Sequence, residues 1–155
     1  MTYRVLIVGS RTQTDVTQVY IQRMGLQTEV SAQDTPEKAY TLLQDGSFDL
    51  VVFCTPSRQR GQHYHLVGVL DALVQEVSYG GSCIFIVSDA QEAQFLSSKI
   101  TIGENQDRMR AILGDHQDTL EMRLRSVARD MLKRPSIQAK GAISFPSAVS
   151  SSASR

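Results

Sequence analysis

A cysteine and an arginine, Cys54 and Arg60, carry the most reactive side-chain chemistry in this chain of 155 residues. Cys54 follows the apolar run 50–53, which is typical of a buried strand, and Arg60 lies six positions later in a loop that precedes a helical pattern. A thiolate is a nucleophile, and a nearby guanidinium can hold the oxygen atoms of an anion. The spacing therefore permits thiol-dependent phosphoryl chemistry at the end of this strand.

Segment 54–60 resembles the phosphate loop of cysteine phosphatases and arsenate reductases. The resemblance implies that Cys54 attacks phosphorus while Arg60 and backbone amides hold the oxygen atoms. Two features depart from the pattern: Pro56 removes an amide donor, and the interior of the loop has no glycine. A cysteine-dependent phosphatase or reductase is therefore kept as an alternative to a simpler interpretation, in which Cys54 is a small buried core residue.

Two histidines near Cys54, His63 and His65, invite a metal interpretation. Residues two apart on a helix point to different faces, and the second cysteine of the chain, Cys83, belongs to a different predicted strand. The sequence also lacks the G-x-G-x-x-G motif of dinucleotide-binding proteins. We therefore expect no metal and no cofactor.

Composition limits the binding partners and the cellular compartment that we expect for this protein. Sixteen basic residues balance 16 acidic ones, so no overall field draws the protein to nucleic acid or to an anionic membrane. No apolar stretch approaches the roughly 20 residues that span a bilayer, and the N-terminus lacks a signal-peptide pattern. Both cysteines fall in predicted core strands, which suits a reducing environment. We expect a soluble cytoplasmic protein.

Apolar runs alternate with helical patterns along the chain. Strands are predicted at 5–8, 27–31, 50–54, 83–87 and 108–113. Helices are predicted from 12 to 24, from 36 to 44, and at 63–78, 90–98 and 117–133, with a modified loop at 99–107. This order predicts an α/β protein with a flavodoxin-like, doubly wound, five-stranded parallel sheet over residues 1–134. Residues 135–155 contain many serines and few large apolar residues, which indicates a flexible tail or linker.

In order and spacing, residues 3–134 resemble the receiver domain of bacterial response regulators, with the best local match between Met24 and Cys54. Active receivers place an acidic pair after the first strand, an aspartate after the third, a hydroxyl after the fourth and a lysine after the fifth. The corresponding positions here are Gly9 and Ser10, Cys54, Ser88, and approximately Gly114. The resemblance implies a degenerate phosphorylation pocket formed by Gly9, Ser10, Cys54 and Ser88, in which only the hydroxyl group is kept.

The missing groups are those that phosphoryl transfer needs. Hard divalent cations prefer carboxylate oxygens, which Gly9 and Ser10 lack, and a cysteine cannot form an acyl phosphate. The sequence therefore resembles a pseudo-receiver, and this resemblance implies a signalling and protein-interaction module that works without phosphorylation and without enzymatic activity. A small-ligand sensor that uses the vacated pocket is a third possibility.

The last predicted helix offers a candidate partner surface. Arg123, Arg125 and Arg129 flank its apolar stripe, either as a docking face or as an ordinary solvated exterior. Receivers commonly bind partners through their fourth helix, fifth strand and fifth helix. The resemblance therefore implies a protein partner or a homodimer that uses the region 88–133.

Overall fold

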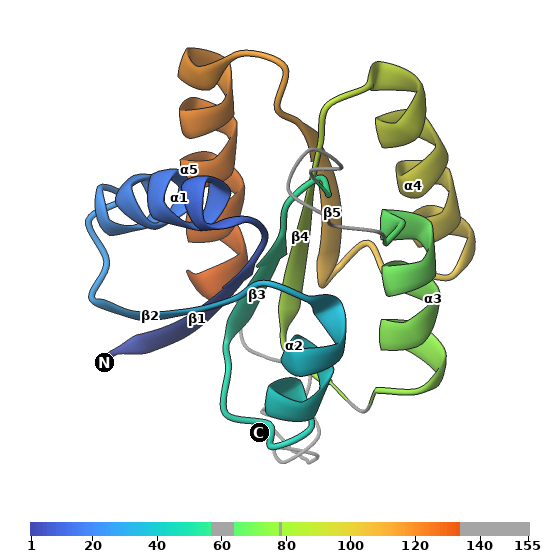
Figure 1. Cartoon of the computed structure of the whole chain (residues 1–155), viewed down its shortest axis with the longest axis horizontal. Coiled ribbons are helices and arrows are strands. Elements are labelled where there is room, and N and C mark those ends of the chain that lie inside the picture. The colour runs from blue at the N-terminus through green and yellow to red at the C-terminus, as the bar shows by residue number, and fades with distance from the viewer. Residues whose placement is uncertain (57–63, 78, 134–155) are drawn as a thin grey trace, which may run out of the picture.

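The computed structural model describes residues 1–56, 64–77 and 79–133, which form one parallel sheet between two layers of helices (Figure 1). The strands are β1 (Tyr3–Val8), β2 (Thr28–Gln33), β3 (Leu50–Phe53), β4 (Ser82–Val87) and β5 (Met109–Leu113). The helices are α1 (Arg11–Gln22), α2 (Pro36–Leu43), α3 (Leu66–Gln75), α4 (Ala90–Ile102) and α5 (Gln117–Lys133). The strand order is β2-β1-β3-β4-β5 with every pair parallel, which confirms the predicted flavodoxin-like fold.

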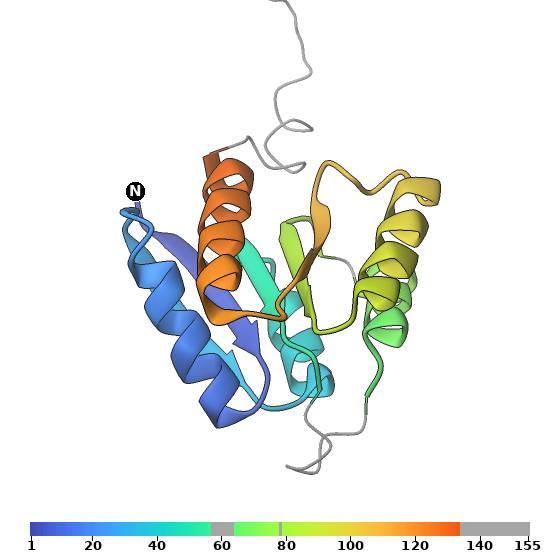
Figure 2. The same cartoon turned by 90° about the horizontal axis from the view of Figure 1, so that it is seen from above.

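Each face of the sheet is covered by its own helices, α1 and α5 on one side and α2, α3 and α4 on the other (Figures 1 and 2). Successive strand residues alternate between two cores, so that Phe53 and Phe85 belong to one and Val52 and Ile84 to the other. This double burial explains why the strands are continuous apolar runs rather than alternating polar and apolar patterns.

Polar caps begin three of the helices. Ser10 caps α1, Thr35 caps α2 with Pro36 in the first turn, and Asp89 caps α4. Caps of these residue types satisfy backbone N–H groups that have no partner inside the helix. Ser10, Thr35 and Asp89 follow β1, β2 and β4, so all three caps lie at the edge of the sheet where the strands end.

Two of the predicted helices have wrong boundaries. The predicted helix 63–78 is shorter, spanning Leu66–Gln75. The fourth helix does not end at Ser98 but continues to Ile102 through the segment predicted as a loop. Its apolar pattern is sparse, yet Leu96 and Ile100 are buried one turn apart, and tertiary packing extends the helix beyond what the sequence pattern indicates. The last helix spans 117–133 as predicted.

The predicted tail at 135–155 lies outside the described residues and stays a prediction. Within the described part of the chain, none of the helices combines the length and the apolar character needed to cross a bilayer.

Candidate functional site

The predicted pocket residues follow the carboxyl ends of the strands. Gly9 and Ser10 follow β1, Cys54 follows β3, and Ser88 follows β4. The backbone N–H of Cys54 donates to the carbonyl oxygen of Val8 at 2.8 Å, which places the end of β3 beside the turn after β1. In parallel doubly wound sheets this edge is where ligands bind.

Gly9 and Cys54 are in close contact. A methyl group added at Gly9 would lie 3.0 Å from Cβ of Cys54, 3.2 Å from its Sγ and 2.7 Å from Oε1 of Gln13. These distances are shorter than ordinary carbon contacts of about 3.5–4.0 Å. A side chain at this position would therefore require Gln13 to move and Cys54 to shift by a few tenths of an ångström.

Ser10 is the N-cap residue of α1. Its hydroxyl accepts a hydrogen bond from the backbone N–H of Gln13 at 3.3 Å, and its own N–H donates to Oε1 of Gln13 at 2.9 Å. This reciprocal pair is a capping box. Ser10 is also 6% exposed, so its oxygen serves the helix rather than a ligand.

Gln13 is the residue of this site that the sequence analysis missed. Its side-chain amide also donates to the carbonyl oxygen of Thr55 at 2.6 Å. One half-buried side chain therefore joins the turn after β1 to the residue that follows Cys54. The pattern Ser-x-x-Gln at positions 10–13 signals the capping box, but nothing local signals the bond to Thr55, which lies 42 residues away.

Two further hydroxyl groups bind the end of β3 to its surroundings. Oγ1 of Thr55 donates to the carbonyl oxygen of Ile86 at 2.7 Å, which links β3 to β4. The hydroxyl of Tyr64 donates to the carbonyl oxygen of Cys54 at 3.1 Å. Burial raises the pKa of the Tyr64 phenol, so that it remains a donor at neutral pH. Together with the bond from Gln13, these two bonds hold Cys54 and Thr55, the residues directly after β3, to three other segments of the chain.

The Cys54 thiol points into the core between the sheet and the helices α1 and α5. Cys54 is 3% exposed, and its Sγ lies 3.8 Å from Oγ1 of Thr17. Burial raises the pKa of the thiol from 9.0 to about 11. Cys83 is buried in the opposite core, so the two thiols lie on different sides of the sheet and are free. Arg60 lies outside the described residues.

We expect Cys54 in the native protein to resist alkylation by iodoacetamide at pH 8, because the thiolate is the reactive form and burial disfavours it. Peptide mass spectrometry after timed quenching measures the modification at each cysteine. In a chemical denaturant both Cys54 and Cys83 are expected to react fully, which controls for the chemistry of the reagent. Rapid native modification of Cys54 would contradict its placement in the core.

The remaining predicted pocket residue, Ser88, is exposed to solvent. It follows β4 at the same edge of the sheet, and within the described residues the structure gives it no hydrogen bond to Gly9, Ser10 or Cys54. Gly114, the approximate lysine position, packs closely as well. A Cβ there would lie 2.8 Å from Cγ2 of Ile86, so a side chain at this position has no space.

Metal ligands do not gather in the part of the chain that the structure describes. No group of three or more His, Cys, Asp and Glu residues is close enough to hold a metal ion within residues 1–56, 64–77 and 79–133. His65 occupies the N-cap position of α3 without a capping hydrogen bond from its side chain. His63 lies outside the described residues.

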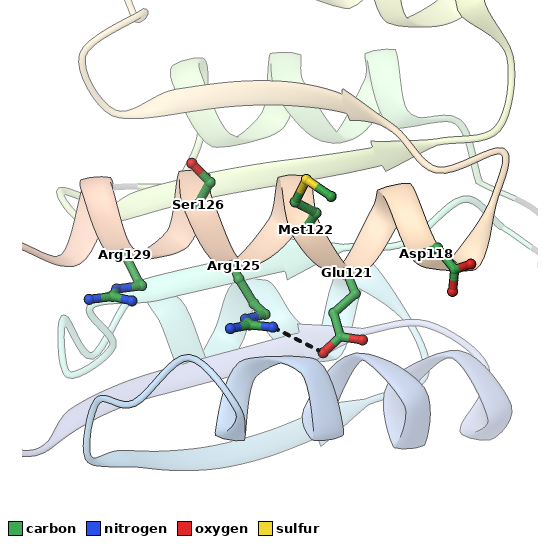
Figure 3. A pocket seen from close by; sticks show the side chains of 6 residues that line it. All are labelled: Asp118, Glu121, Met122, Arg125, Ser126 and Arg129. Atoms are coloured by element: carbon green, nitrogen blue, oxygen red, sulfur yellow. Dashed lines mark hydrogen bonds and ion pairs between the residues drawn. The ribbon is translucent and has the colours of Figure 1, made fainter.

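The three arginines predicted to bind a partner have different surroundings on α5. Arg123 donates to the carbonyl oxygen of Leu113 at 2.8 Å, which fixes the turn between β5 and α5. Arg125 pairs with Glu121 at 3.5 Å (Figure 3). The carboxylate of Glu121 also lies 3.4 Å from Arg23 of α1. Arg129 is exposed and lines an open groove of about 550 Å³ together with Arg125 and Glu121.

Comparison with known proteins supports the architecture. No protein-family model matches the sequence, and no curated protein sequence matches it significantly. Among solved structures, the chain is similar to a CheY-like response regulator receiver domain protein from Methanospirillum hungatei. The similarity has a TM-score of 0.53 at 16% sequence identity and covers 86% of this chain and 98% of that chain. This chain therefore has the flavodoxin-like fold of CheY-like receiver domains.

Proposed function

We propose that this chain is a pseudo-receiver, a signalling module that binds other proteins and works without phosphorylation. The observation that carries the proposal is the bridge formed by Gln13 between Ser10 and Thr55. It lies at the edge of the sheet where receiver domains place phosphoryl chemistry, and its hydrogen bonds join groups within the protein.

The residue types at this edge support the same conclusion. Capture of a hard divalent cation requires oxygen ligands, and phosphoryl transfer depends on that cation to balance the developing charge. Gly9 has no side chain and is closely packed against Gln13 and Cys54, and the Ser10 hydroxyl is engaged in the helix cap. Cys54 offers a buried thiol in place of a carboxylate.

The two alternative functions find less support. A cysteine phosphatase needs an exposed thiolate, whereas burial raises the pKa of Cys54 to about 11. A ligand sensor needs space beside Gly9, where an added methyl group would already lie 2.7 Å from Gln13. The remaining function is contact with another protein through the outer surface of the domain. The partner is a different protein or a second copy of this chain, in the cytoplasm. Arg129 is the predicted partner residue best placed for such contact, because it is exposed on an open groove.

Incubation with acetyl phosphate and Mg²⁺ is expected to add no phosphoryl group to this protein. Intact-mass spectrometry measures the result, and an active receiver domain treated in parallel is the positive control. The variant Cys54→Asp is also expected to stay unmodified, because an acceptor alone does not restore the acidic pair that holds the metal.

Peptide mapping identifies any acceptor that contradicts this expectation. Asp34, Asp89 and Asp115 follow β2, β4 and β5 at the carboxyl edge, and Asp89 caps α4 by accepting from the N–H of Gln91 at 3.0 Å. Asp49 precedes β3 at the opposite edge, and its carboxylate accepts from the N–H of Arg4 at 2.8 Å. Phosphorylation of any of these aspartates would show that the acid pocket lies elsewhere. Turnover of an aryl phosphate that is lost in Cys54→Ser would instead favour the enzyme.

A further inference from the structure

The outward face of α5 carries opposite charges at its two ends. Six residues line the open groove along this face (Figure 3): Asp118, Glu121, Met122, Arg125, Ser126 and Arg129. The acidic residues all lie in the N-terminal half of this set and the basic residues in the C-terminal half. Met122, between them, is an exposed apolar side chain at 69% exposure.

The arrangement of these residues is self-complementary. Asp118 and Arg129 are 11 residues apart, which is about three helical turns and about 16 Å, so they project from the same face. The six residues form three pairs whose midpoints all lie between positions 123 and 124: Asp118 with Arg129, Glu121 with Ser126, and Met122 with Arg125. A twofold axis through that midpoint would place each residue opposite its pair member in a second copy.

The charges at the two ends of the face are available for such pairing. Glu121 is already neutralised by Arg125 and by Arg23 of α1. Asp118 and Arg129 are both exposed, and the structure shows no ion pair for either one within residues 1–56, 64–77 and 79–133. The terminal charges of the face therefore remain to be matched by a partner.

We propose that this face binds the same face of a second copy, with the two α5 helices antiparallel. This proposal names the partner for the protein-contact role proposed above and therefore rests on it. Asp118 of each copy faces Arg129 of the other copy, which gives two ion pairs around a centre of Met122 and the Arg125 side chains. Packed helix axes lie 8–10 Å apart, a separation that long charged side chains span easily. An isologous contact of this kind closes at a dimer.

The size of the face sets the expected strength. One helix of 17 residues is about 25 Å long, and its pairing buries less than the roughly 1,200 Å² typical of stable complexes. Because the contact depends on exposed ion pairs, salt weakens it. The dimer is therefore expected to be weak and reversible, and to dissociate on dilution or at high ionic strength.

Charge reversal tests the pairing. Sedimentation velocity of the full chain over about 1 μM to about 1 mM is expected to show a concentration-dependent dimer. Asp118→Arg and Arg129→Asp each place like charges opposite one another twice, so each should weaken self-association by about tenfold or more. An equimolar mixture of the two single variants should form a heterodimer, because each supplies the charges that the other lacks. The double variant D118R/R129D should dimerise again.

Arg11→Asp is the matched control. It makes the same change of net charge as Arg129→Asp, but at an exposed position at the start of α1 that is not among the six residues of the groove. It is expected to leave self-association within about twofold of the original chain. Circular dichroism of every variant checks that the fold is kept. If dimerisation returns in the mixture and in the double variant, the single variants lost the ion pairs and not the fold.

Two results would overturn the pairing: a monomer at every concentration, or a dimer that the reversals at Asp118 and Arg129 leave unchanged. Neither result would touch the proposed phosphorylation-independent role, which the acetyl phosphate experiment decides. Phosphorylation of the chain, in turn, would overturn that role but leave the outcome of the charge reversals unaffected. The two proposals therefore fail in different experiments.

Discussion

Replacement of Phe85 by alanine is expected to lower the free energy of unfolding by about 3–5 kcal/mol. Phe85 lies in the centre of β4, is fully buried, and stacks on Phe53 of the neighbouring strand with ring centroids 5.8 Å apart. The substitution removes a large apolar side chain and leaves a cavity that a packed sheet cannot close by relaxation. Urea unfolding followed by circular dichroism measures the change.

Phe95→Ala provides the matched control. Phe95 lies on α4 and is 52% exposed, so the same substitution there removes little buried area. Its ring contacts the Lys99 ammonium at 5.8 Å, an interaction of about 0.5–1 kcal/mol at exposed sites. The control is therefore expected to cost about 1 kcal/mol or less. Equal effects at Phe85 and Phe95 would contradict the assignment of Phe85 to the core.

Gln13→Ala is expected to lower the free energy of unfolding by about 2–4 kcal/mol, although alanine has the higher helix propensity. The substitution removes the acceptor of the Ser10 N–H and the donor to the Thr55 carbonyl oxygen. Each half-buried group left without a partner costs about 1–3 kcal/mol. The same denaturation experiment measures the loss, and hydrogen exchange at the Ser10 amide is expected to become faster.

Gln22→Ala, at the end of the same helix, controls for the residue type. Gln22 is exposed, so its replacement is expected to change stability by about 0.5 kcal/mol or less. If Gln13→Ala were as mild as this control and left the exchange of the Ser10 amide unchanged, the bridge across the carboxyl edge would not contribute to stability. The main support for the proposed function would then be lost.

We expect the Gln13 bridge to hold the carboxyl edge of the sheet in one arrangement. In a metal-dependent pocket, ligand binding changes the position of nearby loops, because a charged ion gains or loses contacts. Here neutral hydrogen bonds from Gln13, Thr55 and Tyr64 hold the backbone after β3. No titratable group with an ordinary pKa near 7 takes part in these three bonds. We therefore expect the edge to keep one arrangement across the physiological pH range.

Local patterns predicted most of the fold. Continuous apolar runs indicated strands buried on both faces, and their alternation with helices required a parallel sheet. The sequence predicted the start of α2 at Thr35 and Pro36. A threonine cap accepts a backbone N–H of the first turn, and proline suits the first helical position, so neither needs tertiary contacts. The end of α4 was not predicted, because Ile100 lies in the segment predicted as a loop and is buried there by tertiary packing.

The candidate site, like the fold, has features that the sequence determined and features that only the tertiary structure determined. Residue identity alone determined that Gly9, Ser10 and Cys54 supply no carboxylate at the ends of β1 and β3, because no folding event changes the chemistry of a side chain. Only the tertiary structure decided that Gln13 reaches Thr55, that the Cys54 thiol turns into the core, and that Arg123 binds the carbonyl of Leu113. These contacts join segments that local periodicity does not relate. They depend on the register of neighbouring strands and on the packing of helices over them.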